Sequence, residues 1–210
     1  LVPGCGLGRL PWELAHRGYS SQGNEWSAYM LFASNFVLNC LGGQRGAIPV
    51  FPFAHMYSNC VAAEDQLLSV AIPDVDVSAI PAETNFSMTA GDFLESYTAE
   101  ASWDGIVSCF FLDCAANIIG FIERMFAILK PGGYLFNIGP LLYHFEDRRD
   151  VCYEMSIELT WEELREVLLT TGFQIELEER DVPVPYMNHP RSMLQNSYRA
   201  VFFVARKPLV

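Results

Sequence analysis

The sequence predicts an α/β protein with an open, doubly wound, seven-stranded Rossmann-like sheet and helices on both faces. Three observations support this fold class. The chain opens on a short apolar stretch that runs into a glycine turn and then into a helical pattern. Apolar strand-like runs and helical periodicity alternate through the middle of the chain. Two strand-like segments close the chain, and we expect them to pair antiparallel.

Residues 1–3 are apolar and precede a glycine-rich turn, so they predict a first strand. The chain begins without Met, and we expect this strand to be truncated. A helix is expected over residues 9–17, because Pro11 is tolerated in a first turn and Gly18 can end the helix. Residues 19–24 predict the second strand, with Glu25 at its end.

Residues 26–39 are rich in Met, Leu, Phe and Ala and predict a largely buried helix. Residues 41–85 carry several prolines and predict a long irregular connection, a kind of loop that is often functional. Residues 86–90 predict the third strand. The continuous apolar run within residues 103–112 predicts a strand that is buried on both faces of a parallel sheet.

Ile118, Ile122 and Met125 recur at helical spacing, and Lys130-Pro131-Gly132-Gly133 ends that helix. Residues 134–138 predict the fifth strand. Thr160 and Glu163 form a capping-box pattern ahead of a helix that Gly172 closes. The last two strands are expected at residues 173–179 and 198–205. Acids at 158, 162, 163, 166, 176, 178 and 179 are expected to form a solvated face.

Composition limits the class of protein. The 210 residues are 51% apolar and predict one domain, over residues 1–210. A formal net charge of −12 argues against nucleic acid and anionic membrane surfaces as partners. The six cysteines have no C-x-x-C spacing, so we expect reduced thiols, no metal site and a cytoplasmic location, with the nucleus as a second compartment. A homodimer is the expected form of any self-assembly.

The glycine turn predicts a nucleotide-containing cofactor. Gly4 and Gly6 let backbone N–H groups approach a ligand closely, and Glu25 at the end of the next strand can accept both hydroxyls of a ribose. The third glycine of a dinucleotide fingerprint would fall at position 9, which is Arg. The spacing therefore favours S-adenosylmethionine over a dinucleotide. A purely structural glycine turn is the alternative.

Further cofactor contacts are predicted from the next strands. Asp92 can accept from the adenine amine with Phe93 against the ring, although Asp92 could instead cap the following helix. Cys109 lies on the fourth strand and is either a cofactor contact or a small buried apolar residue. Asp74 and Asp76 could bind a cation, but two acids beside a proline favour a turn.

Six segments together resemble the carnosine N-methyltransferase family, at residues 3–10, 22–27, 85–93, 109–113, 129–133 and 139–145. The resemblance spans nearly the whole chain in order. The segment Gly139-Pro140-Leu141-Leu142-Tyr143-His144-Phe145 is specific, whereas the glycine turn is common to many methyltransferases. Two departures are expected: an N-terminal helical region of the family is absent here, and Asn196 stands where an aromatic residue is expected.

The resemblance implies methyl transfer from S-adenosylmethionine to an imidazole nitrogen of carnosine (β-alanyl-histidine), which gives anserine. It implies that Gly4, Glu25, Asp92, Phe93 and Cys109 line the cofactor site, and that Asp113, His144 and Tyr198 face the dipeptide. Asp113 is expected to orient the imidazole ring and His144 to assist proton removal. Another imidazole substrate, or a non-catalytic cofactor-binding module, remains an alternative, as does a surface role for His144.

Overall fold

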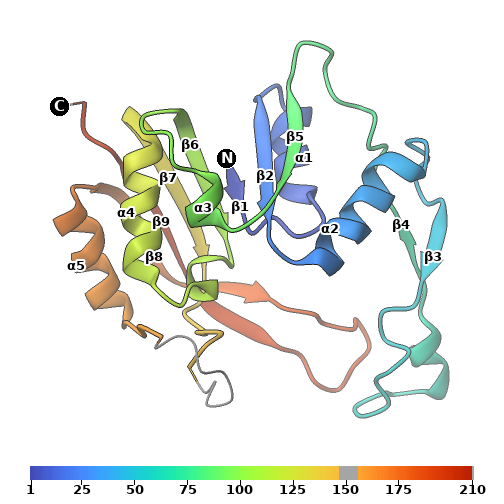
Figure 1. Cartoon of the computed structure of the whole chain (residues 1–210). Helices are drawn as coiled ribbons and strands as arrows, with labels where there is room; N and C mark the ends of the chain where they lie inside the picture. Colours follow the sequence, from blue (N-terminus) through green and yellow to red (C-terminus); the bar gives the residue numbers. More distant parts are fainter. Residues whose placement is uncertain (147–155, 210) are drawn as a thin grey trace.

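A computed structural model of the chain describes residues 1–146 and 156–209. It contains three sheets with helices packed around them (Figure 1). Residues 147–155, which include Cys152, lie outside the described residues.

The first sheet holds the N-terminal strands. Strands β1 (Val2–Pro3), β2 (Ser21–Glu25) and β5 (Phe86–Ala90) are parallel and lie in the order β1-β2-β5. The crossover connections put the carboxyl ends of all three strands at one edge. The glycine turn follows β1 at that edge and Glu25 ends β2.

The second sheet holds the C-terminal strands in the order β6-β7-β9-β8. It consists of β6 (Trp103–Cys109), β7 (Leu129–Gly139), β9 (Ser197–Arg206) and β8 (Gln174–Pro185). β7 is parallel to β6, and β9 is antiparallel to both β7 and β8.

Leu1 joins the two large sheets edge to edge. Its backbone nitrogen donates to Gly105 O at 2.9 Å, and its carbonyl accepts from Val107 N at 2.9 Å. The carboxyl ends of β1 and β6 are therefore neighbours, which brings the glycine turn close to the residues that follow β6.

The helices are α1 (Arg9–His16), α2 (Ala28–Asn35), α3 (Phe93–Ser96), α4 (Ile118–Ile128) and α5 (Trp161–Thr171). Shorter turns are a π turn η1 (Phe36–Cys40) and the 3-10 turns η2 (Ala63–Leu67) and η3 (Leu112–Cys114). The predicted caps of α5 are confirmed: Thr160 and Glu163 form a capping box, and Gly172 ends the helix with φ +113°.

The core lies between α4, α5 and the second sheet. Ile118, Ile122 and Met125 of α4 are fully buried, as are Leu135 of β7 and Leu168 of α5. Burying one such side chain contributes about 1.5–3 kcal/mol relative to leaving it exposed. This core holds the strand ends of the second sheet in place.

Residues 41–85 are more ordered than the sequence predicts. They include an antiparallel pair, β3 (Ile48–Val50) and β4 (Val70–Ile72), which lies to one side of the sheets in Figure 1. The segment docks on α1, where Trp12 Nε1 donates to Val77 O at 2.9 Å and Arg9 pairs with Asp74. Asp76 accepts from Ser78 N at 2.9 Å, so one acid pairs with Arg9 and the other forms a turn.

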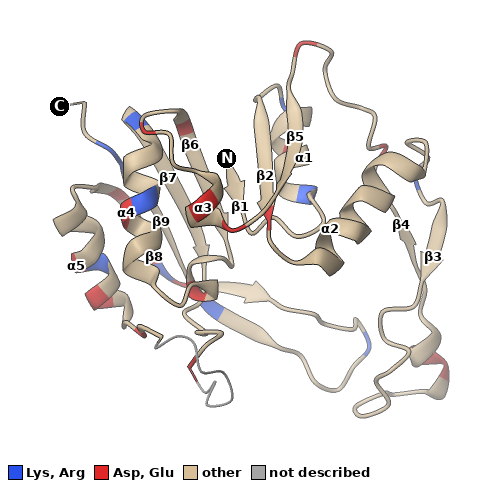
Figure 2. Ribbon diagram, viewed as in Figure 1, with Lys and Arg blue, Asp and Glu red and all other residues tan. Residues whose placement is uncertain are grey.

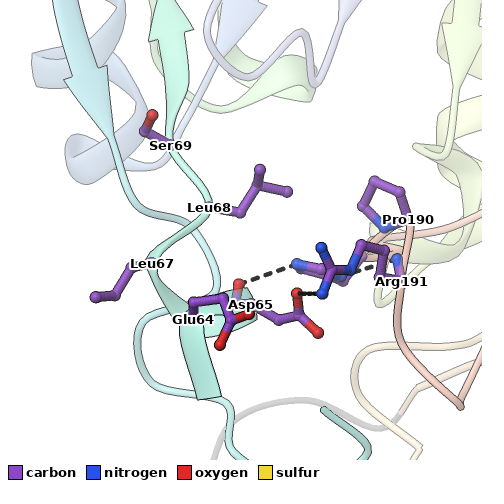
Figure 3. Close-up of a pocket in the computed structure, with 8 residues that line it drawn as sticks. Glu64, Asp65, Leu67, Leu68, Ser69, Pro190 and Arg191 are labelled. Carbon is purple, nitrogen blue, oxygen red and sulfur yellow. Dashed lines mark hydrogen bonds and ion pairs between the residues drawn. The ribbon is translucent and has the colours of Figure 1, made fainter. Parts of the chain in front are cut away.

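The tip of the β8–β9 hairpin docks on the same segment (Figure 3). Asp65 of η2 pairs with Arg191 at 2.8 Å. His189 is buried and its Nδ1 accepts from Arg191 N at 3.0 Å, so its Nε2 carries the proton and donates to Asp65 O at 3.0 Å. A cavity of about 530 Å³ lies between the two segments.

The expectation of a buried helix at residues 26–39 is wrong for this chain. Tyr29 is 87% exposed and Phe32 75% exposed, and the only buried residue of α2 is Ser34. Within the described residues, nothing packs on the outer face of the helix. In Figure 2 the ribbons of α2, β3 and β4 are tan, because these elements contain no Lys, Arg, Asp or Glu.

In the described part of the chain, none of the helices combines the length and the apolar character that a bilayer crossing requires.

Candidate active site

The glycine turn between β1 and α1 is built on backbone conformations that favour glycine. Gly4 has φ +60° and Gly6 has φ +56°. A Cβ on Gly4 would lie 2.3 Å from Cδ2 of Phe111, whereas a Cβ on Gly6 would meet nothing within 4 Å. Packing therefore requires Gly4, and the space above Gly6 is open to a ligand.

Glu25 closes on this turn from the end of β2. One carboxylate oxygen accepts from Gly6 N at 2.8 Å, and the other accepts from Trp26 N at 2.9 Å and Ser27 N at 2.8 Å. The predicted neighbours Gly6 and Glu25 thus lie in direct contact. An anchored carboxylate beside an open backbone cradle fits a ribose.

Asp92 and Phe93 follow β5 at the same edge. Asp92 takes the capping role that the sequence left open as an alternative, and the Phe93 ring turns into the core. Asp92 caps α3, because its Oδ1 accepts from Leu94 N at 2.8 Å and Glu95 N at 3.2 Å. The Phe93 ring is 3% exposed and packs against Phe111 at 5.6 Å in the core. The Phe93 ring is therefore part of the core and offers no free stacking surface on the side of the glycine turn.

An aromatic trio forms where Phe110, directly after β6, meets Tyr186 and Tyr198 of the β8–β9 hairpin. The Phe110 ring stacks on the Tyr186 ring with 5.7 Å between the ring centroids. The Tyr198 ring packs edge-on against both, with its centroid 5.6 Å from that of Phe110 and 5.3 Å from that of Tyr186. Phe110 has φ +52°, a rare conformation for a residue with a side chain. A Cβ on Gly139 would lie 3.2 Å from the backbone of Phe110. Glycine at position 139 therefore leaves room for the unusual Phe110 backbone.

Asp113 and His144 meet beyond the carboxyl ends of β6 and β7. Asp113 is 3% exposed, its Oδ2 accepts from Leu142 N at 3.0 Å, and its carbonyl accepts from His144 N at 3.1 Å. Tyr143 anchors the segment, because its hydroxyl donates to Leu159 O at 2.7 Å. The exposed His144 ring lies with its Nε2 3.9 Å from Cys114 Sγ.

Burial raises the pKa of several acidic groups of the site, namely one carboxyl and two thiols. Burial raises the pKa of Asp113, although the hydrogen bond from Leu142 and the His144 charge oppose it. Burial, Asp113 and Glu25 together raise the pKa of Cys114 to about 12. Because Asp113 and Glu25 act on the same thiol, the β2 and β6 ends face one space. Burial also raises the pKa of Cys109, at the end of β6.

The family model for carnosine N-methyltransferase matches residues 1–209. The chain belongs to the carnosine N-methyltransferase family. It is 49% identical to mouse carnosine N-methyltransferase over 208 residues, which are 99% of this chain and 51% of the mouse protein. It is 41% identical to the Schizosaccharomyces pombe carnosine N-methyltransferase over 220 residues, which cover 98% of this chain and 57% of that protein. The chain thus spans about half the length of these relatives.

Solved structures agree on the fold. A SAM-dependent methyltransferase from Methanosarcina mazei superposes with a TM-score of 0.60 at 16% identity, covering 100% of this chain and 92% of that one. An S-adenosylmethionine-dependent methyltransferase from Mesorhizobium loti gives a TM-score of 0.55 at 14% identity, covering 98% and 89%. The fold of this family member is therefore that of S-adenosylmethionine-dependent methyltransferases.

Three residues of this family member's site were given no role from the sequence. Phe110 lies inside a segment used for the family resemblance, and an aromatic residue three positions before Asp113 could have indicated it. Tyr186 lies between the last two predicted strands, where the sequence predicted no element. Cys114 adjoins Asp113, but a single cysteine carries no pattern.

Proposed function

We propose that this chain transfers a methyl group from S-adenosylmethionine to an imidazole nitrogen of carnosine and releases anserine. The single observation that carries the proposal is the meeting of two groups at one edge of the sheets. The Gly6–Glu25 cradle lies on one side, and Asp113 with His144 lies on the other. Open α/β sheets bind ligands at such strand ends.

The cofactor would be held by the first sheet. Gly4 and Gly6 give the turn its shape, Glu25 would accept the ribose hydroxyls, and Asp92 and the Phe93 backbone would meet the adenine. Cys109 would lie beneath the cofactor. When bound, S-adenosylmethionine supplies an activated sulfonium methyl group. The sheet itself we propose to be one seven-stranded sheet in the order β5-β2-β1-β6-β7-β9-β8, joined at Leu1.

The dipeptide would be held by the second sheet. The imidazole must attack through a nitrogen with a free lone pair while its other nitrogen keeps the proton. Asp113 would accept a hydrogen bond from that N–H and so select the tautomer. His144, exposed beside it, would take the proton from the methylated cation and pass it to solvent. Tyr198 would bound the imidazole pocket, and positioning of this kind can contribute about 7–11 kcal/mol.

The first test is the kinetics of two substitutions. Asp113→Asn removes the carboxylate but keeps the shape, and His144→Ala removes the proton acceptor. Each is expected to lower kcat by about 100-fold or more, in the range that general acid–base groups contribute. Asp104→Asn is the matched control, because Asp104 lies at the start of β6 with its side chain 87% exposed. Near-normal turnover in both site variants would refute the assigned roles.

The second test separates the substrates and the alternatives. Carnosine, homocarnosine and histidine-containing peptides are assayed side by side, and carnosine is expected to give the highest kcat/KM. A higher kcat/KM on a longer peptide would move the assignment to another imidazole substrate. Calorimetry with S-adenosylhomocysteine then decides the binding-module alternative, which would show binding without turnover on any of these substrates.

The partner and the compartment follow from the same proposal. A small dipeptide is the partner that we propose, without nucleic acid, and a homodimer is the proposed assembly. The five cysteines of the described part are free thiols. Free thiols are typical of a reducing compartment, and we propose the cytoplasm.

A further inference from the structure

Three different metal-ligating groups converge where the proposed function places the imidazole ring. The carboxylate of Asp113, the thiol of Cys114 and the imidazole of His144 present donor atoms that all lie within 4.8 Å of one another. Oxygen, sulfur and nitrogen donors in one cluster are typical of zinc ligands. The proposed methyl transfer makes no use of the Cys114 thiol.

The spacing of the donors fits a tetrahedral ion. Zn–S and Zn–N bonds of about 2.3 and 2.0 Å put the two donor atoms about 3.5 Å apart in tetrahedral geometry. Cys114 Sγ and His144 Nε2 are 3.9 Å apart. A movement of a few tenths of an ångström therefore brings the sulfur and the nitrogen to the separation that a bound ion requires. The exposed His144 ring can make this movement.

The backbone holds the three donors in place. Asp113 and Cys114 are consecutive residues of η3, where Cys114 N donates to Phe111 O at 3.0 Å. His144 is tied to this turn because its N donates to Asp113 O at 3.1 Å. Leu142 N donates to Oδ2 of Asp113 at 3.0 Å, which holds the carboxylate beside Cys114 and His144. A site that is organised before the ion arrives loses little entropy on binding.

The charge around the cluster also suits a cation. Asp113 and Glu25 both place negative charge near the Cys114 sulfur. Among the described residues, Asp113 forms no ion pair with Lys or Arg, so no positive side chain competes for its carboxylate.

We propose that Asp113, Cys114 and His144 form a three-ligand site for a thiophilic divalent cation, with Zn²⁺ as the preferred ion, and that an ion bound there blocks the imidazole substrate. The second half rests on the proposed function. Binding displaces the Cys114 proton to solvent and leaves a fourth position open. An imidazole that enters this position donates the lone pair of its ring nitrogen to the ion, so that nitrogen can no longer attack the methyl group. The ion also occupies Asp113 and His144, the two groups proposed to orient the ring and to take its proton.

Direct binding tests the site without any assay of activity. The metal-free chain competes for Zn²⁺ with a chromogenic chelator of known affinity, and one site per chain is expected. Cys114→Ala is expected to weaken that affinity more than about 100-fold, because changes to residues that only support a ligand already cost about 10–100-fold. Cys40→Ala is the matched control, since the Cys40 thiol is exposed on η1. Equal affinity in the wild type and Cys114→Ala would overturn the site.

Two further measurements guard against a folding artefact. His144→Gln changes an exposed side chain and is also expected to weaken Zn²⁺ binding. Co²⁺ is expected to give a near-ultraviolet thiolate-to-metal absorption band in the wild type and in Cys40→Ala. The band should be absent in Cys114→Ala, and its persistence there would assign the thiolate to another cysteine.

Inhibition tests the second half of the proposal. Zn²⁺ is expected to be competitive with the imidazole substrate and not with S-adenosylmethionine, and Cys114→Ala is expected to need at least about tenfold more Zn²⁺ for the same inhibition. Tight binding without inhibition would overturn the blocking role and keep the site. A chain that binds Zn²⁺ but methylates no imidazole would refute the proposed function while the chelator assay still decides the metal site.

Discussion

Gly4 and Gly6 share a left-handed backbone but differ in what surrounds them. A side chain on Gly4 would collide with the Phe111 ring, whereas Gly6 faces open space. The left-handed conformation alone costs a residue with a Cβ about 1–2 kcal/mol. The pair therefore separates backbone strain from packing within one turn.

Alanine at each position gives a residue-scale prediction. Gly6→Ala is expected to lower the free energy of unfolding by about 1–2 kcal/mol, from strain alone. Gly4→Ala is expected to lower it further, because the Phe111 ring must move as well. Urea denaturation measures both. For Gly6→Ala, calorimetry is also expected to show weaker S-adenosylhomocysteine binding, since the new methyl group enters the proposed cofactor cradle. Equal destabilisation by the two substitutions would contradict the packing argument.

The sequence could predict where site residues lie better than which way they point. Glu25 and Asp113 were predicted at strand ends, and parallel pairing aligns such ends at one edge of a sheet. The orientation of Phe93 depends on Phe111 and Phe121, which come from other segments and fill the core around its ring. Local sequence contains no information about those distant neighbours.

At the scale of elements, Glu178 ties β8 to α5. Its carboxylate accepts from Trp161 Nε1 at 2.9 Å and Arg165 Nε at 2.9 Å, and from Arg180 Nε at 2.7 Å. Burial opposes the ionisation of Glu178, but these hydrogen bonds outweigh it and lower its pKa to about 2. The expectation that all acids of this region form a solvated face is therefore wrong for Glu178.

Glu178→Gln is expected to lower the Tm by a few degrees at pH 7, because about 1 kcal/mol corresponds to about 2–4 °C in a chain of this length. A carboxylate with a lowered pKa in the folded state stabilises it above the unfolded value of about 4.5 and loses this effect as the pH falls toward about 2. The difference in Tm between wild type and variant should thus shrink between pH 5 and pH 3.

Glu176→Gln is the control for this prediction. Glu176 lies on the same strand, but its side chain is 44% exposed and pairs with Arg206 only at 3.7 Å. Its Tm is expected to stay close to that of the wild type at both pH values. A difference for Glu178→Gln that stays constant across this pH range would argue against the ionised carboxylate as the cause.

The hairpin tip gives a second prediction at this scale. Tyr186 and Tyr198 flank the loop that closes the β8–β9 hairpin, and Arg191 within this loop pairs with the Asp65 side chain, which is 4% exposed. Removing Arg191 leaves the buried Asp65 carboxylate without its ion-pair partner. We expect Arg191→Ala to raise the KM for carnosine about tenfold, which corresponds to about 1.4 kcal/mol. The reason is that a displaced hairpin loop would move Tyr186 and Tyr198 away from the proposed substrate.

The affinity of Arg191→Ala for S-adenosylhomocysteine is expected to be unchanged, because the proposed cofactor cradle lies on the other sheet. Arg199→Ala is the matched control: Arg199 lies on the same hairpin with an 81% exposed side chain, and its contact with Asp181 is 3.6 Å. Arg191→Lys is expected to raise the KM less than Arg191→Ala does, because lysine keeps the positive charge beside Asp65. An equal change of KM in Arg199→Ala would show a general loss of hairpin order.

At the scale of the whole molecule, periodicity predicted most strands and the helices of the core, because these elements bury one face and display it in the sequence. It placed the helix α2 but not its exposure, and it missed the strands within residues 41–85. An apolar helix pattern cannot show whether a partner surface is present, and the short strands β3 and β4 have only three residues each. The Asp65–Arg191 contact joins residues 126 positions apart, a separation that no local pattern encodes.

The exposed face of α2 yields the last prediction. Tyr29 and Phe32 are one helical turn apart and 87% and 75% exposed, with Trp26 76% exposed just before them. Contiguous apolar surface of this kind favours association. We expect the average mass in sedimentation velocity to rise with concentration, and Phe32→Lys to suppress the rise. Leu169→Lys, at a 38% exposed apolar position of α5, is expected to leave it unchanged. A monomer at all concentrations, or equal suppression by both variants, would show that α2 does not drive association.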